Sequence, residues 1–192
     1  MQRFIFMFCS VIIKIVLITY LGKNVIGRCS TVKSNMAWRI VGMNDCMVCE
    51  RIERIKVNKN PYFVRELNTG YVVIGDHQRI KGYTLFLCKQ HATELHFLEP
   101  NFKVEFLHEM SIVAEAVYNA FKPEKLNYEL LGAGKGLHMH WHIFPRRTGD
   151  TPNGGPVWQL EKDELFAEKY FPDTDELEAL KSQLNIELDK LL

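Results

Sequence analysis

Apolar and polar positions alternate along residues 137–144, and this pattern predicts a β-strand with two unlike faces. Because successive side chains of a strand point to opposite sides, the histidines at 138, 140 and 142 fall on one face. The other face, which we expect to point into a core, carries Leu137, Met139, Trp141 and Ile143. The strand is therefore predicted to be half-buried, with its three imidazoles facing outward.

Other apolar runs predict further strands over residues 63–67, 71–75, 83–88 and 126–131. Asn68-Thr69-Gly70 predicts a tight turn between the first two, and the glycine-rich stretch 132–136 joins the last one to the histidine strand. Strands joined by short turns and interrupted by helices predict an α+β domain built on an antiparallel sheet.

Helical spacing is found in three places. A short helix is predicted over residues 49–55, ended by Asn60-Pro61, and a long one over residues 100–121. In the long helix the apolar positions recur at steps of three or four and predict a core-facing side made of Phe102, Phe106, Met110, Val113, Val117 and Phe121. A final amphipathic helix, residues 175–191, is expected to pack on the core or on a second subunit.

Length and charge indicate one domain with two extensions. The chain has 192 residues, 47% of them hydrophobic, and a net charge of +1, so nothing indicates bulk attraction to nucleic acid. Residues 1–42 hold six Lys or Arg and no acidic residue, whereas residues 161–192 hold ten acidic and four basic residues. We therefore expect an N-terminal extension over 1–42, a globular domain over 43–160 and an acidic helical extension over 161–192.

The segment Phe4–Leu21 contains fifteen apolar residues out of eighteen and is interrupted by Lys14. Three interpretations remain open: a cleaved signal peptide, a membrane anchor of barely sufficient length, or a segment outside the working protein, with Met36 or Met43 as the start. The basic residues are denser after the segment than before it. An anchored form would therefore keep the domain on the cytoplasmic side.

Five cysteines without regular spacing argue against a disulfide framework. Cys46 and Cys49 form a Cys-x-x-Cys pair, which in a reducing compartment is better explained as a metal clip or a redox pair. Half of a tetrahedral zinc site has the same spacing.

The three clustered histidines allow a tri-histidine metal site, a set of surface residues or a catalytic strand. The catalytic interpretation is favoured by context, because His138 to Phe144 resembles the signature of the histidine-triad (HIT) superfamily, His-φ-His-φ-His-φ-φ with φ apolar. Further matches extend the resemblance over about residues 44–160. Within the superfamily the chain resembles the zinc-binding, diadenosine polyphosphate hydrolase-like branch.

The resemblance implies a five-stranded antiparallel sheet with a long helix, usually as a cytoplasmic homodimer. It also implies a nucleotide hydrolase or transferase that cleaves at an α-phosphate through a nucleotidyl-histidine formed on His140. His142 would then assist the leaving group, and His138 completes the triad. AMP-containing substrates are expected, either dinucleoside polyphosphates or nucleoside phosphoramidates. The alternative is a nucleotide-binding regulatory module whose hydrolysis is incidental.

The same resemblance assigns the remaining ligand contacts. Asp76 matches the acidic residue that grips the ribose hydroxyls, and Asn127 matches a polar residue that touches the ligand. Lys135 and Gly136 lie in the glycine-rich turn before the triad, where Lys135 stands in place of the usual Ser or Thr. A second departure is Tyr83, which follows Gly82 where many members carry a fourth histidine.

A structural zinc site is also implied. Cys46 and Cys49 would be joined by His91 and His138, a Cys₂His₂ set that closes the coordination sphere. His138 would then support the catalytic strand and would not serve as acid or base. His77, His96 and His108 have no motif context and are interpreted as surface or core residues.

Overall fold

The computed structural model describes residues 46–134 and 137–192. The predicted extension 1–42, with the segment Phe4–Leu21, lies outside the described residues, as do Lys135 and Gly136. Within the two described ranges, no helix is both long enough and apolar enough to cross a membrane.

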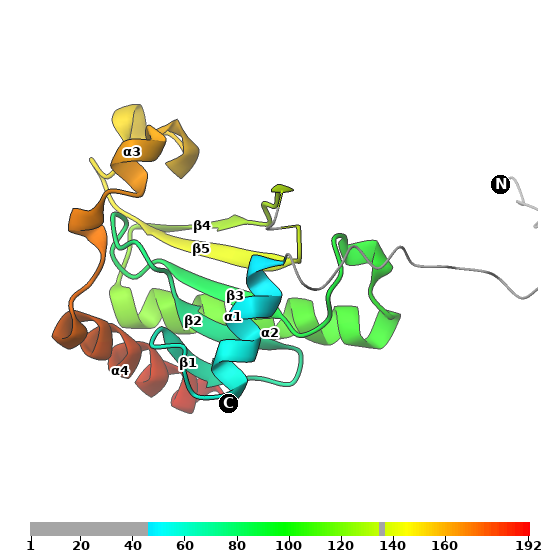
Figure 1. Cartoon of the computed structure of the whole chain (residues 1–192). Coiled ribbons are helices and arrows are strands. Elements are labelled where there is room, and N and C mark those ends of the chain that lie inside the picture. Colours follow the sequence, from blue (N-terminus) through cyan, green and yellow to red (C-terminus); the bar gives the residue numbers. More distant parts are fainter. Residues whose placement is uncertain (1–45, 135–136) are drawn as a thin grey trace, which may run out of the picture. The chain divides into compact units, whose positions relative to one another are not determined.

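The core of the domain is a five-stranded sheet in which all neighbouring strands are antiparallel. The order across the sheet is β1-β2-β3-β5-β4 (Figure 1). The strands are β1 Phe63–Glu66, β2 Gly70–Ile74, β3 Thr84–Cys88, β4 Lys125–Glu129 and β5 His140–Arg146. The predicted α+β class and antiparallel sheet are confirmed.

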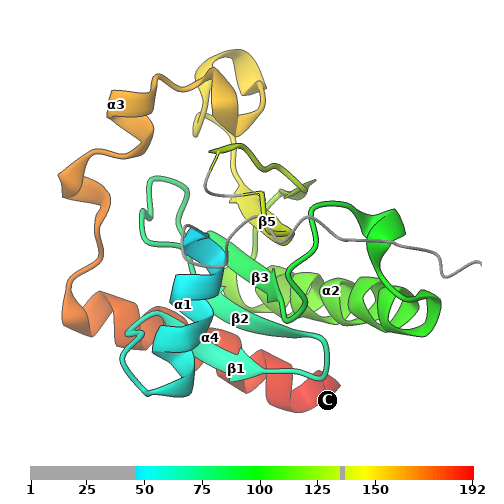
Figure 2. The same ribbon diagram turned by 45° about the vertical axis from the view of Figure 1, so that its right-hand side comes forward.

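The α-helices are α1 Met47–Lys56, α2 Pro100–Phe121, α3 Lys162–Leu165 and α4 Thr174–Leu191. Short 3-10 turns occur at Leu95–Phe97, Pro152–Gly154, Val157–Gln159 and Glu168–Tyr170. The helices α2 and α4 lie on one face of the sheet, and α1 lies on the other (Figures 1 and 2).

The larger core lies between the sheet and the pair α2 and α4. The strand side chains that point toward it include Val72, Ile74 and Phe86, and they pack against Phe106 of α2 and Leu184 of α4. The predicted helix 100–121 is found with the same bounds, because Pro100 suits the first turn and the Glu99 carboxylate accepts the backbone N–H groups of the first turn. The last helix packs on this core.

The opposite face carries a second, smaller core under α1. Ile52 and Ile55 of α1 pack there against Val73 and Leu85. Beyond it Phe144 of β5 packs with Ile80 and with a segment that follows the sheet. The histidine side of β5 therefore lies between α1 and that later segment.

The predicted histidine strand needs two corrections. The strand β5 begins at His140, so His138 precedes it, and Leu137 is 45% exposed and does not point into a core. The imidazoles also do not face outward, because His138 is 1% exposed and His140 is 7% exposed. The cause is the segment after β3: Ala92 accepts the N–H of Met139, which fastens this segment beside the triad.

Candidate functional site

His140 lies at the start of β5, opposite Leu87 of β3. Its Nδ1 lies 2.7 Å from the carbonyl oxygen of His138. Because a carbonyl only accepts, Nδ1 carries the hydrogen and donates it, and Nε2 keeps a lone pair. Burial lowers the pKa of His140, so the ring is neutral near pH 7. The strand therefore holds an imidazole with its nucleophilic nitrogen unprotonated.

His142 is the next residue on the same face of β5, and its ring centroid lies 4.6 Å from that of His140. Its Nδ1 lies 2.6 Å from the hydroxyl of Tyr83. Its Nε2 is buried and makes no hydrogen bond within the described part of the chain. Burial, together with the charge of His140, lowers the pKa of His142 to about 3. The ring is therefore neutral near pH 7.

Tyr83 occupies the position where the resemblance leads one to expect a histidine. Its ring stacks on Phe144 at a centroid distance of 4.3 Å, and burial raises the pKa of its phenol, so the hydroxyl keeps its proton. That proton can be donated to Nδ1 of His142, which leaves the ring hydrogen of His142 on Nε2. Gly75 makes room for the tyrosine, because a Cβ at this position would lie 2.1 Å from the Tyr83 ring.

Asp76 follows β2 and pairs with Arg51 of α1 through both carboxylate oxygens. The Nη1 to Oδ1 distance is 2.8 Å. The pair borders a polar cavity of about 180 Å³, which Tyr62 and Asn60 also line. Asp76, predicted to grip a ribose, thus already accepts hydrogen bonds from an arginine that the sequence analysis did not single out.

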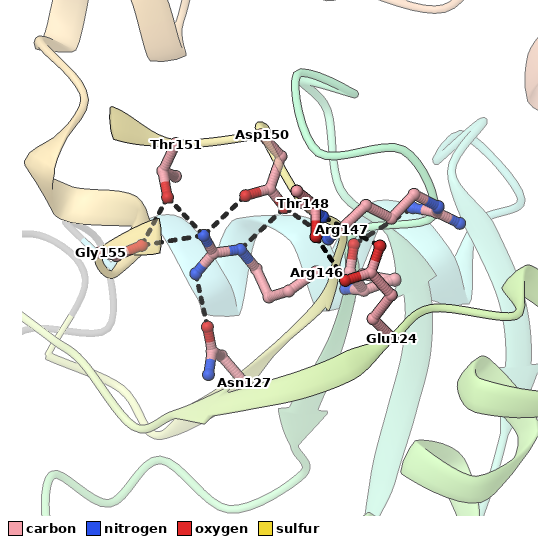
Figure 3. A network of polar contacts seen from close by, with 9 residues as sticks. Glu124, Asn127, Arg146, Arg147, Thr148, Asp150, Thr151 and Gly155 are labelled. Atoms are coloured by element: carbon pink, nitrogen blue, oxygen red, sulfur yellow. Dashed lines mark hydrogen bonds and ion pairs between the residues drawn. The ribbon is translucent and has the colours of Figure 1, made fainter. Parts of the chain in front are cut away.

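Asn127 of β4 is tied to Arg146 at the end of β5. The Asn127 Oδ1 accepts from Arg146 Nη1 at 2.6 Å, and Figure 3 shows the same guanidinium reaching Asp150, Thr151 and Gly155 on its other side. Asn127, predicted to touch the ligand, is therefore oriented by a buried arginine, and the same arginine fixes the loop after β5.

Four side chains predicted to bind zinc come together at the start of α1. Their donor atoms, from Cys46, Cys49, His91 and His138, all lie within 4.8 Å of one another. Cys49 Sγ is 3.1 Å from His91 Nδ1 and 3.3 Å from His138 Nδ1, and Cys46 Sγ is 3.7 Å from His138 Nδ1. Tetrahedral zinc holds its sulfur and nitrogen ligands about 3.5 Å apart, so the set fits this ion.

The orientation of His138 supports the same fit. Its Nε2 lies 2.8 Å from the carbonyl oxygen of Cys88 and therefore carries the hydrogen. Nδ1 is left with a lone pair that faces the two thiols, the orientation that metal-binding histidines adopt when a backbone carbonyl holds the other ring nitrogen. Burial lowers the pKa of His138 to about 4, which keeps the ring neutral.

An apolar cavity beside His142 was not predicted. Its volume is about 280 Å³, and its walls include Ile80, Phe144, Val157, Leu160 and Leu165. His77 also lines it, although the sequence gave that histidine no motif context. The only signal in the sequence was the group of apolar residues within 157–166. This group is too short and too irregularly spaced to predict a helix or a strand.

Comparison with known proteins gives similarities over part of the chain. Residues 60–149 match the profile of the HIT domain. Protein hit of Bacillus subtilis (strain 168) is 30% identical over 95 residues, which cover 47% of this chain and 65% of that protein. The match thus spans just under two thirds of the length of this relative.

Solved structures share the fold. A histidine triad protein from Bradyrhizobium japonicum superposes with a TM-score of 0.57 at 24% identity, covering 70% of this chain and 94% of that one. A hypothetical histidine triad nucleotide-binding protein from Sulfolobus tokodaii strain7 superposes with a TM-score of 0.57 at 20% identity, covering 74% of this chain and 93% of that one. At these identities the likeness concerns the fold.

Proposed function

We propose that the protein is a HIT-type nucleotide hydrolase or transferase with His140 as its nucleophile, a proposal supported by the match of residues 60–149 to the HIT domain profile. Proteins of this family bind or hydrolyse nucleotides, and the similar Sulfolobus tokodaii protein is described as nucleotide-binding. The observation that carries the proposal is the hydrogen bond from His140 Nδ1 to the His138 carbonyl. It leaves the Nε2 lone pair available for attack on phosphorus.

In the proposed reaction, Nε2 of His140 attacks the α-phosphorus and forms a nitrogen–phosphorus bond. The bond from phosphorus to the leaving group breaks, and its electron pair stays on the leaving atom. That atom accepts a hydrogen bond from the Nε2–H of His142, which stabilises its developing charge, and it takes a proton from solvent. Water then attacks the phosphorus, the nitrogen–phosphorus bond breaks with its electron pair returning to His140, and the second proton of the water is released to solvent. The products are a nucleoside monophosphate and the protonated leaving group.

The remaining contacts to the nucleotide are proposed from the sequence. Asp76 would bind the ribose hydroxyls while it stays paired with Arg51, and Asn127 would donate its amide N–H to the phosphate. Lys135 and Gly136, which precede the triad in the sequence, would add a cation and a backbone N–H. AMP-containing substrates are the proposed class.

The first test compares His140→Ala with the unchanged protein on diadenosine tetraphosphate and on an adenosine 5′-phosphoramidate. We expect turnover to fall by several orders of magnitude, because loss of a covalent nucleophile removes the first chemical step. His108→Ala, an exposed histidine on α2, is the matched control and should leave turnover unchanged. Quenching with denaturant at alkaline pH, where a bond from histidine nitrogen to phosphorus survives, should trap label from the α-phosphate on the unchanged protein and none on His140→Ala. Activity retained by His140→Ala would rule out this mechanism.

We also propose that Cys46, Cys49, His91 and His138 hold a structural zinc ion. Bound there, zinc supplies no open coordination position for substrate, because four protein ligands fill a tetrahedral site. The protein side chains join the N-terminus of α1, the segment after β3 and the residues before β5. His138 is then fixed, and with it the carbonyl that orients His140.

A nucleotide-binding regulatory module is the second candidate. It is favoured by the arginine on Asp76 and by Tyr83, which replaces an expected imidazole. Nucleotide binding by calorimetry without turnover of either substrate would support this candidate over the enzyme. A homodimer and a cytoplasmic location, both implied by the resemblance, stay predictions.

A further inference from the structure

The apolar cavity beside His142 is closed by a segment that lies beyond the HIT domain match. Residues 60–149 match the domain, whereas Val157, Leu160, Leu165 and Phe166 come from the residues that follow it. Within the matched residues, Ile80, Phe144 and His142 line the cavity. The segment after the domain match thus supplies one side of the cavity and the matched residues supply the other.

Several polar contacts hold the segment that follows the domain match in place. At its start, Arg146 binds Asp150, Thr151 and the Gly155 carbonyl (Figure 3). Further along, Glu164 accepts from Arg79 Nε at 3.1 Å and from the Tyr170 hydroxyl.

Aromatic and backbone contacts also hold this segment, which lines one side of the cavity. Phe166 and Phe171 meet the ring of His77 edge-on, at centroid distances of 5.0 and 4.4 Å. The N–H of Gln78 donates to the Tyr170 carbonyl at 2.7 Å. The wall is therefore fastened to the loop between β2 and β3 by charge, by hydrogen bonds and by aromatic packing.

We propose that this cavity binds the leaving group of the substrate and selects a compact apolar one, an aryl or branched alkyl amine or alcohol. The inference rests on the proposed function, in which His142 donates a hydrogen bond to the leaving atom. His142 lines the cavity, and its ring centroid lies 4.6 Å from that of His140, so a group that leaves phosphorus toward His142 is directed to the cavity.

Size and charge both exclude a second nucleotide. A volume of about 280 Å³ lies at the lower end of ligand sites, which span roughly 300–1,000 Å³, and suits one ring system. Glu129, the cross-strand neighbour of His142, lines the cavity with a buried carboxyl group that offers no positive charge to the phosphates of a nucleotide leaving group. Lys162 offers one opposing charge, too little for a polyphosphate chain in an apolar site.

The test uses the full chain and four substrates: adenosine 5′-phosphoramidate, its N-methyl and N-(naphthylmethyl) derivatives, and diadenosine tetraphosphate. We expect kcat/KM to be at least tenfold higher for the naphthylmethyl compound than for the unsubstituted one, because filling an apolar pocket changes selectivity by about 10–200-fold. Diadenosine tetraphosphate should be the poorest substrate. Equal rates across the phosphoramidates, or a preference for the dinucleotide, would overturn the inference.

Leu165→Gln makes the cavity wall polar, and Leu107→Gln makes the same change on the outer side of α2. Leu165→Gln should remove the preference for the naphthylmethyl compound while it keeps the rate on the unsubstituted one. Leu107→Gln should change neither. An equal loss on all substrates would contradict a leaving-group site, and melting curves of both variants verify that each is folded.

Binding separates this inference from the proposed function. His140→Ala protein should bind the naphthylmethyl compound at least tenfold more tightly than the unsubstituted one, measured by calorimetry. If the unchanged protein shows this binding preference but no turnover, the role of His140 as nucleophile is wrong and the apolar subsite is supported. Equal binding of the two compounds would overturn the subsite whatever the turnover.

Discussion

Tyr83 is the residue at which this chain departs most informatively from the resemblance. Its hydroxyl lies 2.6 Å from His142 Nδ1 and is positioned to set which ring nitrogen carries the hydrogen. Tyr83 does not need to contact substrate for this effect. It is a positioning residue, and its influence should appear in the step that needs a proton.

Tyr83→Phe should lower kcat by about 10- to 100-fold on an alkyl phosphoramidate with little change in KM, because the hydrogen of His142 is then no longer held on Nε2 for the leaving atom. A nitrophenyl ester of AMP, whose leaving group needs no proton, should lose much less. The Phe ring keeps the stacking on Phe144, so packing is matched. Tyr83→His should restore part of the rate. Equal losses on both substrates would indicate a structural role alone.

Single residues also mark the limit of prediction from sequence. The spacing of Cys46 and Cys49, with His91 and His138 from the resemblance, identified four side chains that the fold brings within 4.8 Å. The arginine partners of Asp76 and Asn127 were missed, because an arginine on a helix or at a strand end looks like an ordinary surface residue. Only the fold reveals that Arg146 is buried among acceptors.

At the scale of elements, the loop after β5 depends on the pairing of Arg146 with Asp150. Burial of Asp150 would raise its pKa, but the hydrogen bonds from Arg146 and from the Arg147 N–H outweigh it, so the pKa lies below the ordinary value of 3.8. A carboxylate with a lowered folded-state pKa stabilises the fold above the unfolded-state pKa. That stabilisation is lost as pH falls through the folded value.

Asp150→Asn should therefore lower the free energy of unfolding by about 1–3 kcal/mol at pH 7, the range for hydrogen bonds to charged groups. The difference from the unchanged protein should stay constant down to about pH 4 and shrink below it. Urea unfolding at several pH values measures this, with the exposed Asp163→Asn as control. A difference that grows as the pH falls would contradict the assigned pairing.

The helix α4 contributes a row of leucines to the larger core. Leu184→Ala should cost about 2–5 kcal/mol of unfolding free energy, because it leaves a cavity beside α2 and the sheet. Ile186→Ala, on the outer side of the same helix and 52% exposed, should change it by less than about 0.5 kcal/mol. Similar effects of both changes would mean that α4 is not packed on the core.

Elements with a strong period were predicted well and those without one were not. The helix α2 was predicted over residues 100–121, its observed bounds, because its apolar positions keep a helical period for six turns. The start of β5 was missed, since alternation continues through residues 137–139 although hydrogen bonds to the segment after β3 replace the strand pairing there. The wall over residues 157–166 has no period, because short 3-10 turns and a single turn of helix build it.

At the scale of the whole molecule, the four cysteine and histidine ligands connect parts of the chain that are distant in sequence. Zinc bound there should stabilise the folded state, because the ligands come together only on folding. We expect one zinc per chain in purified protein, and a lower melting temperature after treatment with a chelator. Cys46→Ser should abolish both the metal content and the response to chelator.

Cys88→Ser is the matched control, because the Cys88 thiol packs in the larger core and is not among the four proposed zinc ligands, while its backbone carbonyl is unchanged by the substitution. The Cys88→Ser variant should keep its zinc and its response to chelator, even where the substitution lowers the free energy of unfolding. Removal of zinc should also lower kcat, because it frees His138, whose carbonyl accepts the Nδ1 hydrogen of His140. Unchanged protein that is metal-free and insensitive to chelator would refute the zinc site. Loss of stability without loss of turnover would show that zinc supports the fold but does not orient the nucleophile.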